Sequence, residues 1–197
     1  MENREITSVD LDMLQEIGNI GSGSAATALS SMINKTVLIE VPGVKLVKIF
    51  EISSTIGNDE DIKTGIFINI NGTLNGFIIL LLDDCDALML NDLIVNIYGS
   101  GVDQEAILSE IGNIISGSYI SAIASMINGT INLAPPILGH DMLCSLLDGF
   151  VSAICAVADS TVVIENDLII DDKKIGCSSL LLLETDSLNK LLDYFKF

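Results

Sequence analysis

A glutamate followed three residues later by an asparagine occurs twice in this chain of 197 residues, as Glu16 with Asn19 and as Glu110 with Asn113. Residues three apart on a helix are neighbours on its surface. A carboxamide is a poor base and nucleophile, but it donates and accepts hydrogen bonds in fixed geometry, which suits the orientation of a water molecule. The glutamate beside it can bind a partner's lysine. Because neither group binds Mg²⁺ convincingly alone, the pair favours completion of another protein's active site.

Glycines follow the first pair, and the stretch GSGSAA from Gly21 fits the G-x-G-x-x-G/A form of a dinucleotide-binding loop. The second copy reads ISGSYI and lacks the first glycine. Such a loop also follows a strand, whereas helical spacing precedes this one. Glycine costs roughly 1 kcal/mol inside a helix. We therefore predict that Gly18 and Gly21 allow close approach to a sheet or to a sister helix.

The chain is internally duplicated. A shift of 94 residues aligns residues 16–36 with residues 110–130, and 14 of these 21 positions are identical. The second half carries about six extra residues, which we place around a predicted loop, APPILGHDML at 134–143. Each half is small for a domain, so we predict a single domain over 1–197, made of two repeats (about 8–98 and 103–197) that share a core.

Each half begins with a long helix, expected at about 8–34, with Ser8 as its N-cap, and at about 103–128. Short helices are expected at 84–98 and 186–195. β-branched segments between them predict strands, and Asn-Gly turns favour antiparallel hairpins; the predicted strands are TVLIEV, KLVKIFEI, GIFINI and GFIILLL, then TINLA, FVSAICAVA, STVVIENDLII and GCSSLLLL. The predicted fold class is α+β, with pseudo-twofold halves, a mostly antiparallel sheet and two long helices packed on one face.

The first long helix has one stripe of apolar and small residues, expected to face the core: Leu11, Leu14, Gly18, Gly21, Ala25, Ala28 and Met32. The Glu-Asn pairs lie on the opposite faces. Their predicted neighbours are Asp12, Met13 and Ile20 in the first helix, and Ile107 and Ile114 in the second. Such a face is either a docking patch or an ordinary solvated surface. Its repetition favours docking, although duplication copies neutral residues too.

Composition narrows the partners. The formal net charge is −18, with only nine Lys and Arg, which argues against nucleic acid and anionic membranes. The acidity serves solubility, or it attracts a basic protein surface. The longest aliphatic run has six residues, and the polar start shows no signal peptide, so we expect a cytoplasmic protein without membrane insertion. We expect a monomer, because internal duplication lets one chain present two sites. One histidine and four cysteines without C-x-x-C spacing argue against a zinc site and a Ser-His-Asp triad.

The spacing of these residues resembles a family signature. The signature of the CheC, CheX and FliY chemotaxis phosphatases is Asp or Ser, three residues, Glu, two residues, Asn, about 22 residues and Pro. Asp12, Glu16, Asn19 and Pro42 match it in the first half. Glu110, Asn113 and Pro136 match it in the second half, where Ala106 replaces the Asp or Ser. The duplicated organisation is most similar to that of CheC-type members.

The resemblance implies hydrolysis of the phospho-aspartate of the response regulator CheY. Asn19 and Asn113 would orient the attacking water, and Glu16 and Glu110 would pair with a lysine of CheY. The Mg²⁺ would belong to CheY, and this chain would have no cofactor of its own. Asp12, Pro42 and Pro136 would support the sites. CheD is implied as a second partner.

Two other functions remain open at this point. One is a non-catalytic adaptor that docks CheD or a response regulator. The other is a structural component of the flagellar switch.

Overall fold

The computed structural model describes residues 7–154 and 160–195. Its first element is the long helix α1 (Ser8–Ile33). Thr7, rather than the predicted Ser8, is the N-cap: its hydroxyl accepts from the backbone N–H of Asp10 (3.3 Å), whose carboxylate accepts from the backbone N–H of Thr7 (2.8 Å). This reciprocal capping box satisfies two backbone donors that a helix start leaves unpaired.

The second long helix, α4 (Gln104–Met126), begins at the N-cap Asp103. Both long helices are followed by an asparagine in the left-handed region, Asn34 (φ 52°) and Asn128 (φ 48°). Asparagine tolerates this conformation better than most residues. The two predicted long helices are therefore confirmed.

Among the described helices, α4 is the one that is long and apolar enough to cross a membrane. Its apolar side chains pack inside the protein: Ile111, Ile115, Ile120 and Ile123 are buried in the main core. Burial of this kind gives a core helix the same composition as a membrane span.

The helical glycines sit at close contacts, as predicted. A Cβ on Gly18 would lie 3.3 Å from Val41 Cγ1, on the sheet. A Cβ on Gly21 would lie 2.5 Å from Tyr119 Cδ1 and 3.0 Å from Tyr119 Cα, on the sister helix. The buried face of α1 is otherwise shifted from the predicted stripe, because Ala28 is exposed and Leu29 is buried.

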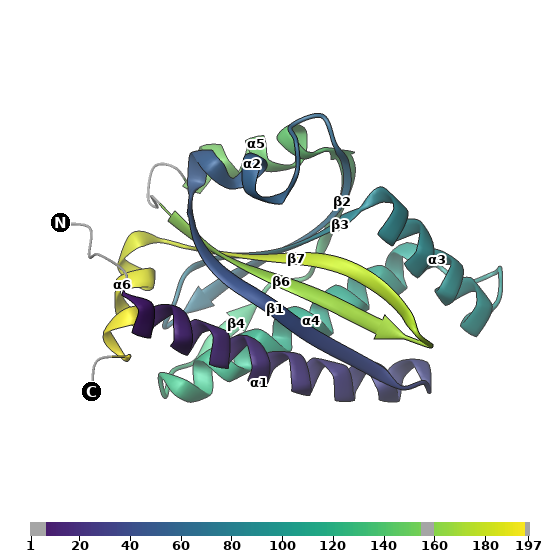
Figure 1. Cartoon of the computed structure of the whole chain (residues 1–197), viewed down its shortest axis with the longest axis horizontal. Coiled ribbons are helices and arrows are strands. Elements are labelled where there is room, and N and C mark those ends of the chain that lie inside the picture. The colour runs from purple at the N-terminus through teal and green to yellow at the C-terminus, as the bar shows by residue number, and fades with distance from the viewer. Residues whose placement is uncertain (1–6, 155–159, 196–197) are drawn as a thin grey trace.

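Within the described residues, seven strands form one sheet in which all the pairings are antiparallel. The order is β1-β6-β7-β3-β2-β4, and β5 also pairs with β2. The strands are β1 (Val37–Lys48), β2 (Ile62–Gly72), β3 (Gly76–Asp83), β4 (Ile131–Leu133), β5 (Ile137–Met142), β6 (Ser160–Ile170) and β7 (Lys173–Leu183). Figure 1 shows the sheet above α1 and α4.

The strand pairing exchanges segments between the halves. Strand β1 of the first half pairs with β6 of the second, and β4 and β5 of the second half pair with β2 of the first. The registers correspond, since Gly43 pairs with Glu165 as Ile137 pairs with Phe67. Neither half therefore has a contiguous sheet of its own, which supports the proposal of one domain built from two repeats.

The predicted place of the extra residues is wrong. Lys48 ends β1 and Met142 ends β5, so the 94-residue offset still holds at residue 142, almost at the end of segment 134–143. The halves diverge after this point. The first continues with a short turn (Ile49–Glu51) and α2 (Ile52–Ile56), whereas the second has the longer α5 (Leu143–Ile154).

Three predicted strands differ from the structure. TVLIEV and KLVKIFEI form one strand, β1, which ends at Lys48. Residues 150–154 of the predicted strand FVSAICAVA belong to helix α5, and residues 155–158 lie outside the described residues. Segment 137–142, predicted as part of a loop, is strand β5. Pairing across the whole sheet decides these cases, and local pattern alone does not report it.

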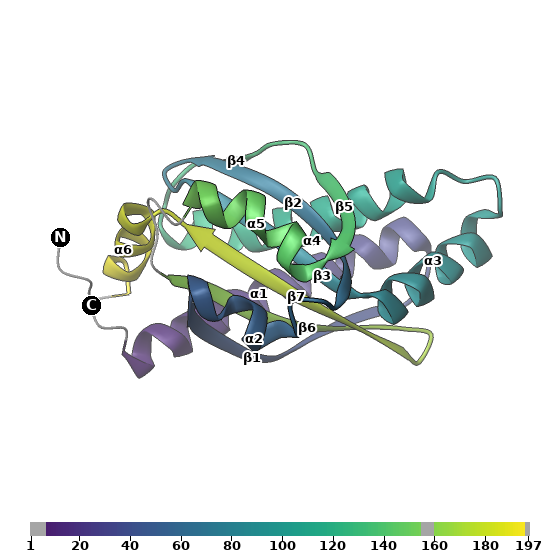
Figure 2. The same ribbon diagram turned by 90° about the horizontal axis from the view of Figure 1, so that it is seen from above.

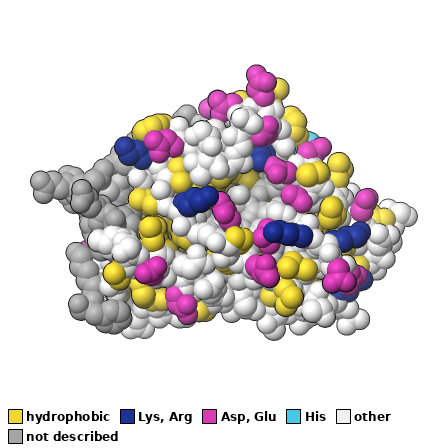
Figure 3. Space-filling model, viewed as in Figure 1, with side chains coloured by type: hydrophobic (Ala, Val, Ile, Leu, Met, Phe, Trp, Pro, Cys, Tyr) yellow, Lys and Arg dark blue, Asp and Glu magenta, His cyan; other side chains and the backbone are white. Residues whose placement is uncertain are grey.

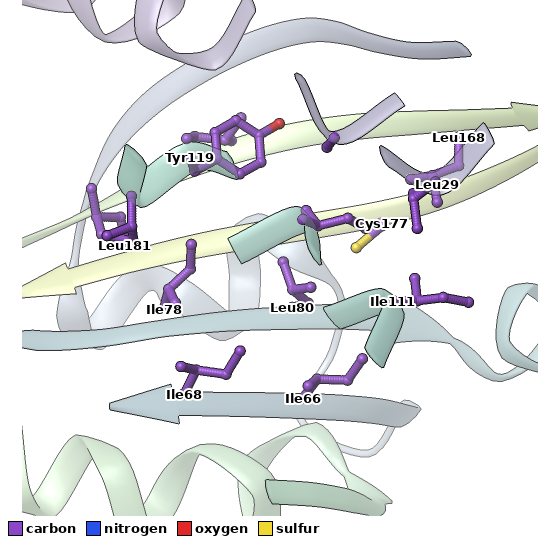
Figure 4. Packing of buried hydrophobic residues seen from close by; sticks show 14 of the residues in the cluster. Leu29, Ile66, Ile68, Ile78, Leu80, Ile111, Tyr119, Leu168, Cys177 and Leu181 are labelled. Atoms are coloured by element: carbon purple, nitrogen blue, oxygen red, sulfur yellow. The ribbon is translucent and has the colours of Figure 1, made fainter. Parts of the chain in front are cut away.

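The core lies on both faces of the sheet. The larger cluster packs α1 and α4 against one face, together with α3 (Asp84–Tyr98) and α6 (Thr185–Asp193); Figure 4 shows part of it, with Tyr119, Ile68, Ile78 and Leu80 labelled. A smaller cluster on the other face includes Val163, Leu180 and Leu182, with Ile52 from α2 and Leu146 from α5. Figure 2 shows α2 and α5 over that face. The long helices are thus anchored to the sheet along one side and leave the other side free.

Candidate functional site

Helix α1 presents the first Glu-Asn pair to solvent. Glu16, Asn19 and Asp12 are exposed, and Ile20 beside them is 46% exposed. Met13 is half-buried against the main core. The buried residues Leu14, Ile17 and Gly18 fix the opposite side of the same turns. A rigid core helix therefore carries the pair outward, as predicted.

Helix α4 presents the second pair less openly. Glu110 is exposed, but Asn113 is half-buried, as are Ile107 and Ile114. Ala106, which stands at the position of Asp12, is exposed, and its backbone N–H donates to the Asp103 cap (3.1 Å). The second pair is thus present in similar form, with less of the amide accessible.

The two pairs are separate. Helices α1 and α4 lie side by side and run in opposite directions (Figures 1 and 2), and they meet closely where Gly21 faces Tyr119. Asn19 precedes this contact in α1, and Asn113 precedes it in α4. Because the helices are antiparallel, the pairs lie on opposite sides of the contact. The geometry offers two sites rather than one composite site.

The two signature prolines act on strand geometry. Pro42 is in edge strand β1 at a β-bulge, where the register shifts between Glu40 and Gly43. It lines a pocket of about 390 Å³ with Glu165 and Asp167, on the sheet face opposite α1. Pro136 lies between β4 and β5, in the equivalent break. Proline has no N–H for a strand ladder and is found at edges and bulges.

Sequence reasoning missed one residue of the first site, Gln15. Its Nε2 donates to the backbone carbonyl of Val41 in the bulge (3.1 Å) and to Oδ1 of Asn19 (3.4 Å). The signal was available, because positions 15 and 19 are four apart on one helix and such polar pairs interact. The signature proline is thereby linked to Asn19 through the bulge and Gln15.

A buried polar network lies beneath the helices. The Tyr119 hydroxyl lies 2.8 Å from Ser22 Oγ and donates to Oδ1 of Asn166, whose Nδ2 donates to Ser179 Oγ (2.7 Å). Burial raises the pKa of Tyr119 above its usual range. Burial likewise raises the pKa of the neighbouring Cys177 to about 12. These groups are uncharged at neutral pH and serve to join the two helices to the sheet.

Among the residues that the structure describes, no cluster of three or more His, Cys, Asp or Glu side chains is placed to hold a metal ion. Positive and negative side chains lie side by side on the surface. Lys45 pairs with Glu165 (2.5 Å) and Lys174 with Asp167 (2.7 Å), and Figure 3 shows lysines interspersed with acidic side chains. No broad basic area appears on the face drawn there. The arrangement can orient hydrogen-bonded groups of a partner.

The sequence model of the CheC-like family matches residues 9–46 and 104–140. These segments contain both Glu-Asn pairs and both signature prolines.

Among characterised proteins, the chain is 26% identical to the CheY-P phosphatase CheC of Bacillus subtilis, over 94% of this chain and 93% of that protein. It is 28% identical to the flagellar motor switch phosphatase FliY of the same organism, over 67% of this chain but only 36% of FliY. In structure it is similar to FliY of Thermotoga maritima, with a TM-score of 0.75, 23% identity and 98% of each chain covered. The fold, the repeated pairs and these similarities agree: the chain matches the CheC-like family over residues 9–46 and 104–140 and is similar to a CheC protein over most of its length.

Proposed function

We propose that this chain dephosphorylates the phospho-aspartate of the response regulator CheY. One observation carries the proposal: two rigid helices each present a Glu-Asn pair at their outer surface, and the matching relatives are a CheY-P phosphatase and a flagellar motor switch phosphatase. Neither asparagine is itself an effective base or nucleophile. The reacting groups would thus come from the partner.

In the proposed mechanism, each asparagine enters the acyl-phosphate pocket of CheY and holds a water in line with the bond that breaks. The water attacks phosphorus, the aspartyl oxygen leaves, and the products are the free carboxylate and inorganic phosphate. Glu16 or Glu110 pairs with a lysine of CheY and fixes the orientation of the two proteins. Mg²⁺ would be held by CheY and would neutralise phosphoryl charge. Positioning of this kind can remove several kcal/mol from the barrier without a covalent intermediate.

The decay of phosphorylated CheY tests the proposal. We expect Asn19→Ala and Asn113→Ala each to lower the acceleration, and the double variant to lower it by at least about tenfold, because loss of a transition-state hydrogen bond commonly costs that much. Asn96→Ala provides a matched control, since Asn96 is an exposed asparagine on α3. Circular dichroism and a thermal melt establish that each variant is folded.

A double variant that accelerates decay as well as the unaltered protein would overturn the catalytic assignment. Binding of CheY without acceleration by the unaltered protein would favour the adaptor. The half-buried Asn113 and the exposed Asn19 predict that the first site contributes more to the total rate.

We further propose that the chain binds CheD as a second partner and that it is a monomer. We also propose that it is located in the cytoplasm, together with CheY. These proposals rest on the family signature and on the internal duplication, which lets one chain present two sites. The surfaces of α3 and α6 are candidates for CheD, and Leu88 on α3 is 57% exposed. Light scattering of the chain alone and mixed with CheD tests the first two points. A mass above that of one chain for the protein alone would contradict the monomer, and the absence of a complex with CheD would contradict the second partner.

A further inference from the structure

We propose that Gln15 is a positioning residue that sets the orientation of the Asn19 carboxamide. The proposal deepens the proposed function and rests on it for its kinetic consequence. Its structural part stands on two contacts, from Gln15 Nε2 to the Val41 carbonyl (3.1 Å) and to Asn19 Oδ1 (3.4 Å).

The bulge in β1 supplies the fixed end of this chain of contacts. Val41 and Pro42 together stand opposite Asn166, between the pairs Glu40–Asp167 and Gly43–Glu165. A bulge interrupts the ladder and redirects backbone groups. Here the Val41 carbonyl accepts from a side chain of α1, and Gly18 allows the helix to approach the same residue, because its Cβ would lie 3.3 Å from Val41 Cγ1.

The chemistry of the donors then determines both amide orientations. A backbone carbonyl only accepts, so Gln15 must turn its NH₂ group, and not Oε1, toward Val41. The other hydrogen of the same nitrogen is directed to Asn19, which must accept it with Oδ1. The Asn19 NH₂ group is consequently the end left for a partner. The orientation of an amide is normally ambiguous, and this chain of contacts removes the ambiguity.

An outward NH₂ group suits the proposed reaction. Phosphoryl oxygens and the lone pairs of water accept hydrogen bonds, and a water that accepts from Asn19 keeps a second lone pair for attack on phosphorus. An amide oxygen in that place would repel the phosphoryl group. Without Gln15 the amide would occupy both orientations, and only one of them is competent.

The second half lacks this device. Ser109 stands at the position of Gln15, and its side chain is too short to span the same two partners. The equivalent strand is also divided at Pro135 and Pro136 into β4 and β5. The two sites therefore differ in how firmly the amide is held as well as in exposure.

The kinetic test uses the Asn113→Ala background, in which only the first site remains. We expect Gln15→Ala and Gln15→Glu to lower kcat for phosphorylated CheY by about two- to fivefold, the effect of losing one exposed hydrogen bond, with KM unchanged. Gln15→Glu is the sharper variant, because it keeps the shape of the side chain but cannot donate to Val41. Ser109→Ala in the Asn19→Ala background is the matched control and should leave kcat unchanged.

A second readout does not depend on activity. The side-chain ¹H–¹⁵N resonances of Asn19, assigned through Asn19→Ala, should move in Gln15→Ala and in Gln15→Glu while backbone resonances of β6 and β7 stay in place. Unchanged Asn19 resonances, or an unchanged kcat in the Asn113→Ala background, would overturn the proposal. If the unaltered chain does not hydrolyse phosphorylated CheY, the proposed function fails, and the resonances alone decide the role of Gln15.

Discussion

Each half presents a Glu-Asn pair on its long helix, but the packing beneath the two pairs differs. Gly21 on α1 faces Tyr119 on α4, and the repeat places Ile115 on α4 and Ala25 on α1 at the corresponding positions. Both contacts thus place a small residue opposite a large one. Both small residues, Gly21 and Ala25, are on α1, and both large ones, Tyr119 and Ile115, are on α4. Packing constrains the summed volume of facing residues and not each one, so two copies joined in one chain can diverge reciprocally.

The polar network shows the same divergence. The Ser22 hydroxyl is hydrogen-bonded to the Tyr119 hydroxyl, which donates to Asn166, and Asn166 donates to Ser179. The sister residue Ser116 is buried, and its hydroxyl has no hydrogen-bond partner among the described residues. The strand registers place Ile68 and Leu80 where the other half has Asn166 and Ser179. One half has a polar connection between helix and sheet, and the other has hydrocarbon side chains at the same places.

The substitution with the largest expected effect disrupts the reciprocal packing of the two long helices. Gly21→Ala should lower the free energy of unfolding by about 1–3 kcal/mol, because its Cβ meets the side chain and backbone of Tyr119 and overpacking costs this much. Gly23→Ala is the matched control: its Cβ meets nothing within 4 Å, so the better helix propensity should stabilise by up to ~1 kcal/mol. Urea denaturation measures both. Equal changes would show that the helices do not approach closely at Gly21.

A smaller effect separates the two serines. Ser22→Ala should cost about 1 kcal/mol, the net worth of a buried hydrogen bond, because Tyr119 loses a partner. Ser116→Ala should be neutral or stabilising by a few tenths of a kcal/mol, since it removes an unpaired buried hydroxyl. The helix-propensity gain is common to both variants and cancels in the comparison. Equal costs in urea denaturation would contradict the assigned difference between the halves.

The smallest effect at neutral pH concerns Cys177, which occupies the place of Ile78 in the other half. Burial raises its pKa from 9.0 to about 12, so the folded state keeps a proton that the unfolded state releases. The stability due to this group is complete below pH 9 and is lost as pH rises from 9 to 12, by at most about 1.4 kcal/mol per pH unit. Stability curves of the unaltered protein and Cys177→Ala should therefore converge over that interval. Parallel curves would contradict the shift.

Local pattern predicted the long helices, the close contacts of Gly18 and Gly21, and the outward Glu-Asn pairs, because each follows from spacing along one helix. It predicted the N-cap of α1 at Ser8, one residue after the observed cap, Thr7. It also failed at strand β5 and helix α5, whose states depend on pairing with β2 and packing on the second sheet face. Helical spacing alone could have indicated the contact of Gln15 with Asn19, but not its contact with the Val41 carbonyl, which is 26 residues away and becomes available only at a bulge.

By itself the sequence determined the repeat, the residue types of the two candidate sites and their position on helices, since these depend on neighbours within a few turns. Only the tertiary structure decided that the halves exchange strands, that the two pairs lie on opposite sides of a helix contact, and which end of Asn19 faces outward. Those features depend on contacts between residues far apart in the chain, and the free energy of such contacts is set by the packing of the whole sheet.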